Sequence, residues 1–136
     1  MTQTGDDLVQ FLRARLDEDE QLAQAATPGP WTQSGIGDYG WTVSFSQPGS
    51  GVETADSDQG RADADFIASH DPARVLAEIA SKMSILTDYT KEQWVMEQGH
   101  RTGWTEGGQS VREYLIKGWA ALYESHPDYR QEWRRP

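Results

Sequence analysis

The stretch ASHDPARVLAEIASKMSIL, residues 68–86, places a His-Asp-Pro triplet directly before an apolar run. Asp71 is a residue type that favours the N-cap of a helix, and Pro72 suits the first helical position because its missing N–H would be unpaired there. Apolar residues then recur at the period of an amphipathic helix, namely at Val75, Leu76, Ile79, Ala80, Met83 and Leu86. The triplet is therefore interpreted first as the start of a long helix that continues to about residue 98.

A second amphipathic pattern precedes it, over residues 6–26, where Leu8, Phe11, Leu12 and Leu16 recur at helical spacing. Thr4 and Asp7 resemble a capping pair at its start. The segment TPGP, residues 27–30, ends the pattern because proline cannot continue a helical hydrogen-bond ladder. We predict an N-terminal helix over residues 6–26.

Between these helices the period changes to two, most clearly in WTVSFS, residues 41–46, where large apolar and small hydroxyl residues alternate. Turn-rich segments at residues 34–40 and 47–51 flank this strand, and residues 31–33 and 52–55 are candidate neighbouring strands. A small sheet is marginal alone in water, so its apolar face needs helices to cover it. We predict an antiparallel β-meander over residues 31–58.

The remaining segments complete an α+β fold. A short helix is expected within residues 60–69, with Phe66 and Ile67 buried, and the glycine-rich residues 99–109 are expected to form a loop. Ser110 is expected to begin the last long helix, and Ser125 resembles the N-cap of a short helical piece. The core side of the last helix would carry Val111, Tyr114, Leu115, Trp119, Leu122 and Tyr123. We predict a single domain, residues 1–136, with a small meander packed against three long helices and a C-terminal tail.

Composition limits the function classes. The 136 residues carry a net charge of −10 and no cysteine, so thiolate metal sites and cysteine nucleophiles are excluded. The acidity lies in the first half, because residues 1–71 hold thirteen acids and three bases whereas residues 72–136 hold nine of each. This balance disfavours direct binding to nucleic acid or to anionic membranes. No apolar run predicts a membrane span or a leader, and we expect a cytoplasmic chain without a cofactor.

Three blocks of the sequence resemble an uncharacterised family of small actinobacterial and actinophage proteins. The blocks are DDLVQFLRARLDEDEQLAQAA at residues 6–26, ADADFIASHDPARVLAEIASKMSIL at residues 62–86 and LYESHPDYRQEWRRP at residues 122–136. Residues 87–108 depart from the family's pattern, and residues 94–108 look particular to this chain. The resemblance implies an organisation and a host range but no activity, substrate or cofactor.

Two histidine–aspartate pairs are candidates for chemistry. If the helix starts at His70-Asp71 and His126-Asp128 lay side by side, two imidazoles and two carboxylates could complete a metal shell. An acid–base enzyme that uses His70 and Asp71 is a related hypothesis. Neither pair shows the HExxH spacing or the motif of a nucleophile elbow. The structural interpretation, a capping aspartate and locally bonded histidines, is preferred.

The aromatic content suggests a binding module instead. Six tryptophans and five tyrosines exceed what a small core easily buries, and Trp, Tyr and Arg dominate interface hot spots. Trp104, Arg130, Trp133 and Arg134 are the candidate interaction residues, although Trp133 could instead hold the tail against the body. We predict a non-catalytic protein-interaction or regulatory module that binds a protein partner or forms a homodimer. An acidic mimic of nucleic acid is a further hypothesis, which the run at residues 17–20 suggests.

Overall fold

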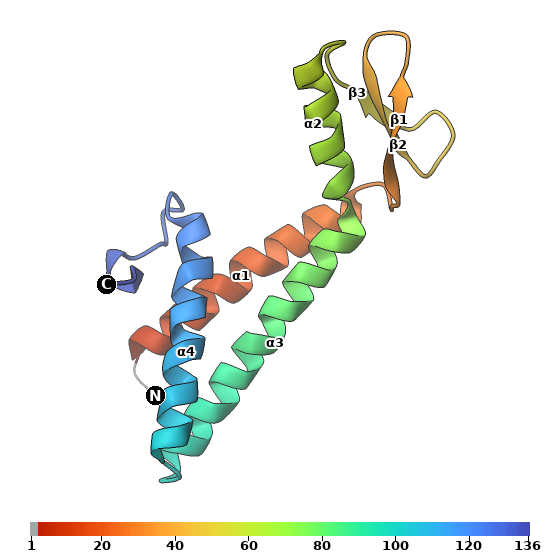
Figure 1. Ribbon diagram of the computed structural model, residues 1–136. Helices are drawn as coiled ribbons and strands as arrows, with labels where there is room; N and C mark the ends of the chain where they lie inside the picture. Colours follow the sequence, from red (N-terminus) through yellow and green to blue (C-terminus); the bar gives the residue numbers. More distant parts are fainter. Residues whose placement is uncertain (1–2) are drawn as a thin grey trace. The chain divides into compact units, whose positions relative to one another are not determined.

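The computed structural model describes residues 3–136, and their side chains from residue 5 onward. Figure 1 shows helices and strands in one chain, which confirms the predicted α+β class. The elements in chain order are α1 (Gln3–Ala25), β1 (Trp31–Ile36), β2 (Trp41–Phe45), β3 (Gly51–Glu53), α2 (Asp58–Ser69), α3 (Pro72–Glu97), α4 (Gly103–Ala120), and the 3₁₀ turns η1 (Ala121–Tyr123) and η2 (Gln131–Trp133).

The chain forms two compact units. One unit contains the chain up to Asp19 together with Ala80–Pro136, and the other contains Glu20–Ile79. The divisions fall inside α1 and α3, so each of these helices contributes to both units. The expectation of a single domain stays a prediction.

In the unit of residues 20–79, the strands form an antiparallel sheet in the order β1-β2-β3, as the meander predicts. Trp31 pairs with Phe45 across β1 and β2, and their rings stack with centroids 4.2 Å apart. Val43, at the centre of β2, is fully buried. The alternation of WTVSF therefore gives the sheet one apolar face.

The helix that packs on this sheet is α2, through contacts with β1 and β2 (Figure 1). Its buried residues are Gly60 and Ala64, whose small size allows a close approach. The predicted burial of Phe66 is wrong, because its side chain is 66% exposed and its ring stacks on His70. The prediction that long helices cover the sheet is also corrected, since α2 has 12 residues and begins earlier than expected, after an N-cap at Ser57.

The other unit has its core between α1, α3, α4 and the C-terminal tail. Leu8, Leu12 and Leu16 of α1 are almost fully buried, as their spacing predicts. On the facing elements the buried apolar residues are Leu86, Tyr89, Met96, Ile116, Ala120, Tyr129 and Trp133. The predicted cap at Thr4 is wrong, because α1 already includes Gln3 and Thr4.

The glycine-rich residues 99–109 were predicted to form a loop, and this prediction is wrong for most of them. α4 already begins at Gly103, and residues 103–109 are helical. Thr102 explains this start, since its side chain accepts a hydrogen bond from the N–H of Thr105 while the Thr105 hydroxyl accepts one from the N–H of Thr102. This reciprocal cap stabilises the first turn despite the low helix propensity of glycine.

The predicted helical piece at Ser125 is also corrected. α4 ends at Ala120 and continues as η1, and residues 124–128 then form a turn. The N–H of Tyr129 donates to the carbonyl oxygen of His126 at 3.0 Å, which closes the chain reversal without a helix. After this turn, η2 brings Trp133 into the core.

Candidate protein-interaction surface

α4 packs on the core through a row of one amide and two aliphatic side chains. Ile116 and Ala120 are fully buried, and Gln109 is 5% exposed. The amide of Gln109 donates to the carbonyl oxygen of Tyr89 at 2.8 Å and to the Gln93 side chain at 3.0 Å. Because these bonds satisfy its amide hydrogens, Gln109 occupies a core position that an apolar residue would normally fill.

The apolar stripe of α4 lies on the side opposite this row. Trp104 is 91% exposed, Val111 61% and Tyr114 56%. The sequence predicts Val111, Tyr114 and Leu122 on the core side of the last helix. This prediction is wrong, because Val111 and Tyr114 of α4 and Leu122 of η1 are exposed. We call Trp104, Gly107, Val111, Tyr114 and Gly118 the outer face of α4.

The C-terminal tail reaches the outer face through Arg135. Its Nε–H donates to the carbonyl oxygen of Tyr114 at 2.9 Å, and its guanidinium lies 3.7 Å from the centroid of the Tyr114 ring. The same guanidinium lies where a side chain on Gly118 would stand. Beside it is an open hollow of about 160 Å³, lined by Ser110, Glu113, Tyr114, Lys117, Arg135 and Pro136.

The four predicted interaction residues have different environments. Trp104 is exposed, in the first turn of α4 rather than in a loop. Trp133 is 1% exposed, so its prediction as a contact residue is corrected in favour of its alternative role in holding the tail. Arg130 pairs with Asp7 at 2.8 Å and lies over the Trp133 ring, which also holds the tail. Arg134 remains on the surface, 3.6 Å from Glu124.

His126 joins α1 to the turn before the tail. Its Nδ1 accepts hydrogen bonds from the Arg15 guanidinium at 3.1 Å and from the N–H of Asp128 at 3.0 Å. Arg15 also pairs with Glu18 at 2.9 Å, and the His126 ring packs edge-on against Phe11. His126 and Asp128 therefore take part in a packed turn rather than in an open metal shell.

Tyr123 in η1 makes a second contact with α1. Its hydroxyl donates to a carboxylate oxygen of Asp19 at 2.5 Å. Burial raises the pKa of Tyr123 well above its ordinary value of 10.0, and the hydrogen bond to Asp19 raises it further. The tyrosine is thus a neutral donor at physiological pH, and its contact with Asp19 is structural.

The structure places His70 and Asp71 at the junction of α2 and α3. A side-chain oxygen of Asp71 accepts from the N–H of Arg74 at 3.0 Å, and Pro72 is the first residue of α3, so the N-cap prediction is confirmed. Nδ1 of His70 lies 3.0 Å from the carbonyl oxygen of Phe66, to which it donates. The Asp71 carboxylate and the His70 ring therefore both have local hydrogen-bonding partners.

Asp71→Ala is expected to lower the free energy of unfolding by about 0.5–2 kcal/mol, because the replacement leaves an N–H at the start of α3 without a partner. Asp71→Asn and Asp71→Ser retain an acceptor and should cost little. Chemical denaturation followed by circular dichroism measures all three. Equal losses for the three variants would contradict the capping role.

Metal coordination can be tested against the described residues. Among residues 3–136, no group of three or more His, Asp or Glu side chains is arranged to hold a metal ion. His70 and Asp71 belong to one unit, and His126 and Asp128 to the other. Within the same residues, no helix is long and apolar enough to cross a membrane.

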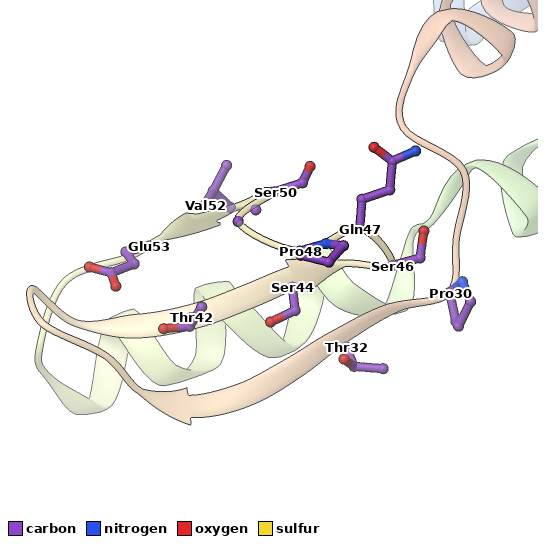
Figure 2. A pocket seen from close by; sticks show the side chains of 12 residues that line it. Pro30, Thr32, Thr42, Ser44, Ser46, Gln47, Pro48, Ser50, Val52 and Glu53 are labelled. Atoms are coloured by element: carbon purple, nitrogen blue, oxygen red, sulfur yellow. The ribbon is translucent and has the colours of Figure 1, made fainter.

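An open hollow of about 660 Å³ lies on the sheet, and Figure 2 shows the side chains that line it. Figure 2 shows hydroxyl side chains of neighbouring strands along it, among them Thr32, Thr42 and Ser44. Glu53 is the charged residue of its lining, and its carboxylate accepts from the N–H of Tyr39 at 3.0 Å. The lining therefore offers mainly neutral hydroxyl groups beside this one carboxylate.

Residues 5–135 match a family of unknown function, DUF6221. The chain belongs to this family. No match was found among curated proteins or among solved structures. The expected membership of an uncharacterised family is thereby confirmed. The expected host range stays a prediction.

The DUF6221 match runs through residues 94–108, which were expected to be particular to this chain. The end of α3 and the beginning of α4 are thus part of the region that the family covers. Sequence reasoning missed Gly118 and Arg135 as parts of the outer face, because their approach depends on how the tail folds back. The spacing of seven residues from Trp104 to Val111 and from Val111 to Gly118 is the signal that could have found the face.

Proposed function

We propose that the chain is a non-catalytic protein-interaction or regulatory module that binds its partner through the outer face of α4. The observation that carries the proposal is the exposure of Trp104, 91%, on the same side of the helix as Val111 and Tyr114. Large aromatic side chains are the commonest anchors of protein interfaces, and burying one contributes more than almost any other contact.

The chemistry of the outer face supports this use. Its side chains are apolar or absent, and none of its five members carries a formal charge. The charge nearest this face is the Arg135 guanidinium, which lies on the Tyr114 ring and over Gly118. A partner that covers the face would also contact this guanidinium, and Trp, Tyr and Arg are the residue types that dominate interface hot spots.

The local bonds of the alternative sites also favour binding over catalysis. Asp71 caps α3, and His70 donates to the carbonyl oxygen of Phe66. For an acidic mimic of nucleic acid, free carboxylates in a row would be needed, but Glu18 pairs with Arg15 and Asp19 accepts from Tyr123. The resemblance of three sequence blocks supports an actinobacterial or phage source, and the absence of cysteine suits a cytoplasmic location.

Native mass spectrometry of the protein, purified from an actinobacterial host, tests the proposal. Wild type is expected to carry a protein partner in stoichiometric amount, either another protein or a second copy of the chain. Val111→Arg places a charge in the middle of the outer face and should release this partner while circular dichroism stays unchanged. Bare monomers for wild type and variant, or a stoichiometric metal or small molecule on both, would overturn the proposal.

A further inference from the structure

The sheet has two faces of different chemistry. The face towards α2 bears Trp41, whose ring centroid lies 5.0 Å from the guanidinium of Arg61 in α2. It also bears Gln33, whose amide donates to the Asp65 carboxylate of α2 at 3.0 Å. Because side chains alternate along a strand, the residues next to these point to the opposite, open face. We call this face the hydroxyl face, and its residues on β1 and β2 are Thr32, Ser34, Thr42 and Ser44.

The hydroxyl face forms part of the hollow of about 660 Å³ (Figure 2). Thr32 pairs with Ser44, and Ser44 pairs with Gly51, so one row of residues crosses all three strands. Gly51 has no side chain, which leaves space beside the Ser44 hydroxyl at the β3 end of the row. The volume lies within the roughly 300–1,000 Å³ that is typical of small-molecule sites.

A carboxylate is fixed at one end of the hydroxyl face. Glu53 pairs with Thr42 across β2 and β3, and its carboxylate accepts from the N–H of Tyr39 at 3.0 Å. A side chain on Gly37 would overlap both this carboxylate and the Thr42 hydroxyl, so the glycine allows the two groups to lie close together. A carboxylate has about four acceptor positions, and several therefore stay free for a ligand.

The charge around the hollow favours a cation. Glu53 is the only charged residue among the described residues that line it. The unit of residues 20–79 holds nine acids and two bases, a net charge of −7. Both bases have other contacts, since Arg61 lies on the Trp41 ring and Arg74 pairs with Glu78 at 3.2 Å. Such a field attracts cations and repels anions.

The hydroxyl groups favour a ligand that is itself rich in hydroxyls. An apolar ligand would take the Ser and Thr side chains out of water without replacing their hydrogen bonds. A hydroxyl both donates and accepts, so ligand hydroxyls can pair with the face in either direction. Pro30 and Pro48 add apolar edges to the lining, which suit the C–H groups of a sugar ring. An amino sugar combines these hydroxyls and C–H groups with a positive charge.

We infer that the hollow on the sheet is a binding site for a small polyhydroxylated amine of the amino-sugar class, whose ammonium group pairs with Glu53 while its hydroxyls bond to the hydroxyl face. The inference goes beyond the proposed function, because the hollow belongs to residues 20–79 and the outer face of α4 belongs to the other unit. An open site covers only part of its ligand, so we expect a dissociation constant on the order of millimolar and loss of the ligand during purification.

NMR chemical-shift mapping of the isotope-labelled full chain tests the inference with three probes. D-glucosamine and D-glucose differ at one ring position, where an amine replaces a hydroxyl, and D-glucuronate carries a negative charge instead. At slightly acidic pH, glucosamine is expected to shift the amide signals of β1, β2 and β3 saturably and to bind roughly 10-fold more tightly than glucose. Glucuronate should bind least. Equal affinities for the three sugars, or no saturable shift in the sheet at tens of millimolar glucosamine, would overturn the inference.

Variants locate the charge and the hydroxyls that the ligand uses. Glu53→Gln keeps an acceptor for the N–H of Tyr39 and should abolish the preference for glucosamine over glucose. The matched control is Asp63→Asn, which removes one negative charge from α2 outside the hollow and should keep the preference. Thr32→Val retains the shape of the side chain without its hydroxyl and should weaken both sugars several-fold.

An unchanged preference in Glu53→Gln, or its loss in Asp63→Asn as well, would show that Glu53 does not hold the ammonium group and would overturn the inference. Circular dichroism checks that each variant is folded. Val111→Arg lies in the other unit and should bind glucosamine as wild type does, so failure of the sugar site and failure of the proposed function are distinguishable.

Discussion

Trp133→Ala is expected to lower the free energy of unfolding by about 3–5 kcal/mol, the usual cost of truncating a buried aromatic side chain. The indole is 1% exposed and lies 5.0 Å from the Phe11 ring and 5.6 Å from the Tyr129 ring, centroid to centroid. Its loss leaves a cavity between α1 and the tail and removes the ring that lies under Arg130. Urea denaturation followed by circular dichroism measures the effect.

The matched control for this experiment is Trp104→Ala. The same side chain is removed from a site that is 91% exposed, so the cost should stay within about 0.5 kcal/mol at a protein concentration below self-association. Trp133→Phe should recover part of the loss, because the indole Nε1 has no hydrogen-bond partner among the described residues and phenylalanine has no such group. Similar costs for Trp133→Ala and Trp104→Ala would show that the tail does not contribute to the core.

Gly60→Ala is expected to destabilise the chain by several kcal/mol, or to prevent α2 from seating on the sheet. A methyl group on Gly60 would overlap the carbonyl oxygen of Ala55, which belongs to the backbone and cannot rotate away. Any shift would also disturb the carbonyl oxygen of Gly60, which accepts a hydrogen bond from the Thr54 hydroxyl at 2.6 Å. Overpacking of a closed contact typically costs about 1–3 kcal/mol and more where backbone must move.

Gly107→Ala is the control for the glycine substitution. A methyl group there meets no atom within 4 Å, and the residue lies inside α4. Alanine should therefore stabilise the helix by about 0.5–1 kcal/mol, in the opposite direction to Gly60→Ala. Thermal unfolding of both variants, at low protein concentration, shows whether each substitution raises or lowers the stability. Destabilisation by both would indicate a general intolerance of the helices rather than a close contact at Gly60.

Local signals predicted much of the fold. The cap at Asp71, the first helical residue Pro72 and the alternation of WTVSF act within a few residues of the chain, and α3 and β2 follow them. The capping pair of Thr102 and Thr105 is a signal of the same kind, but the surrounding glycines favoured a loop and concealed it. Two reciprocal hydrogen bonds from backbone N–H groups to side-chain hydroxyls decided this boundary against propensity.

Which side of α4 faces the core could not be predicted from its hydrophobic pattern. That pattern assigns the core to the most apolar side, whereas α4 is packed through Gln109, Ile116 and Ala120. Two conditions reverse the expectation: Tyr89 and Gln93 satisfy the amide of Gln109, and Ala120 allows a close helix contact. Both depend on residues far along the chain, and the candidate surface follows from them.

The short sheet has a consequence for aggregation. Its edge strands are β1, whose pairing is irregular between Gln33 and Ile36, and β3, which has only three residues. Long, flat and regular edges invite strands from other molecules and lead to fibrils, while short or irregular edges resist such growth. Even in a concentrated solution, copies of this chain would therefore have a poor template for cross-β stacking.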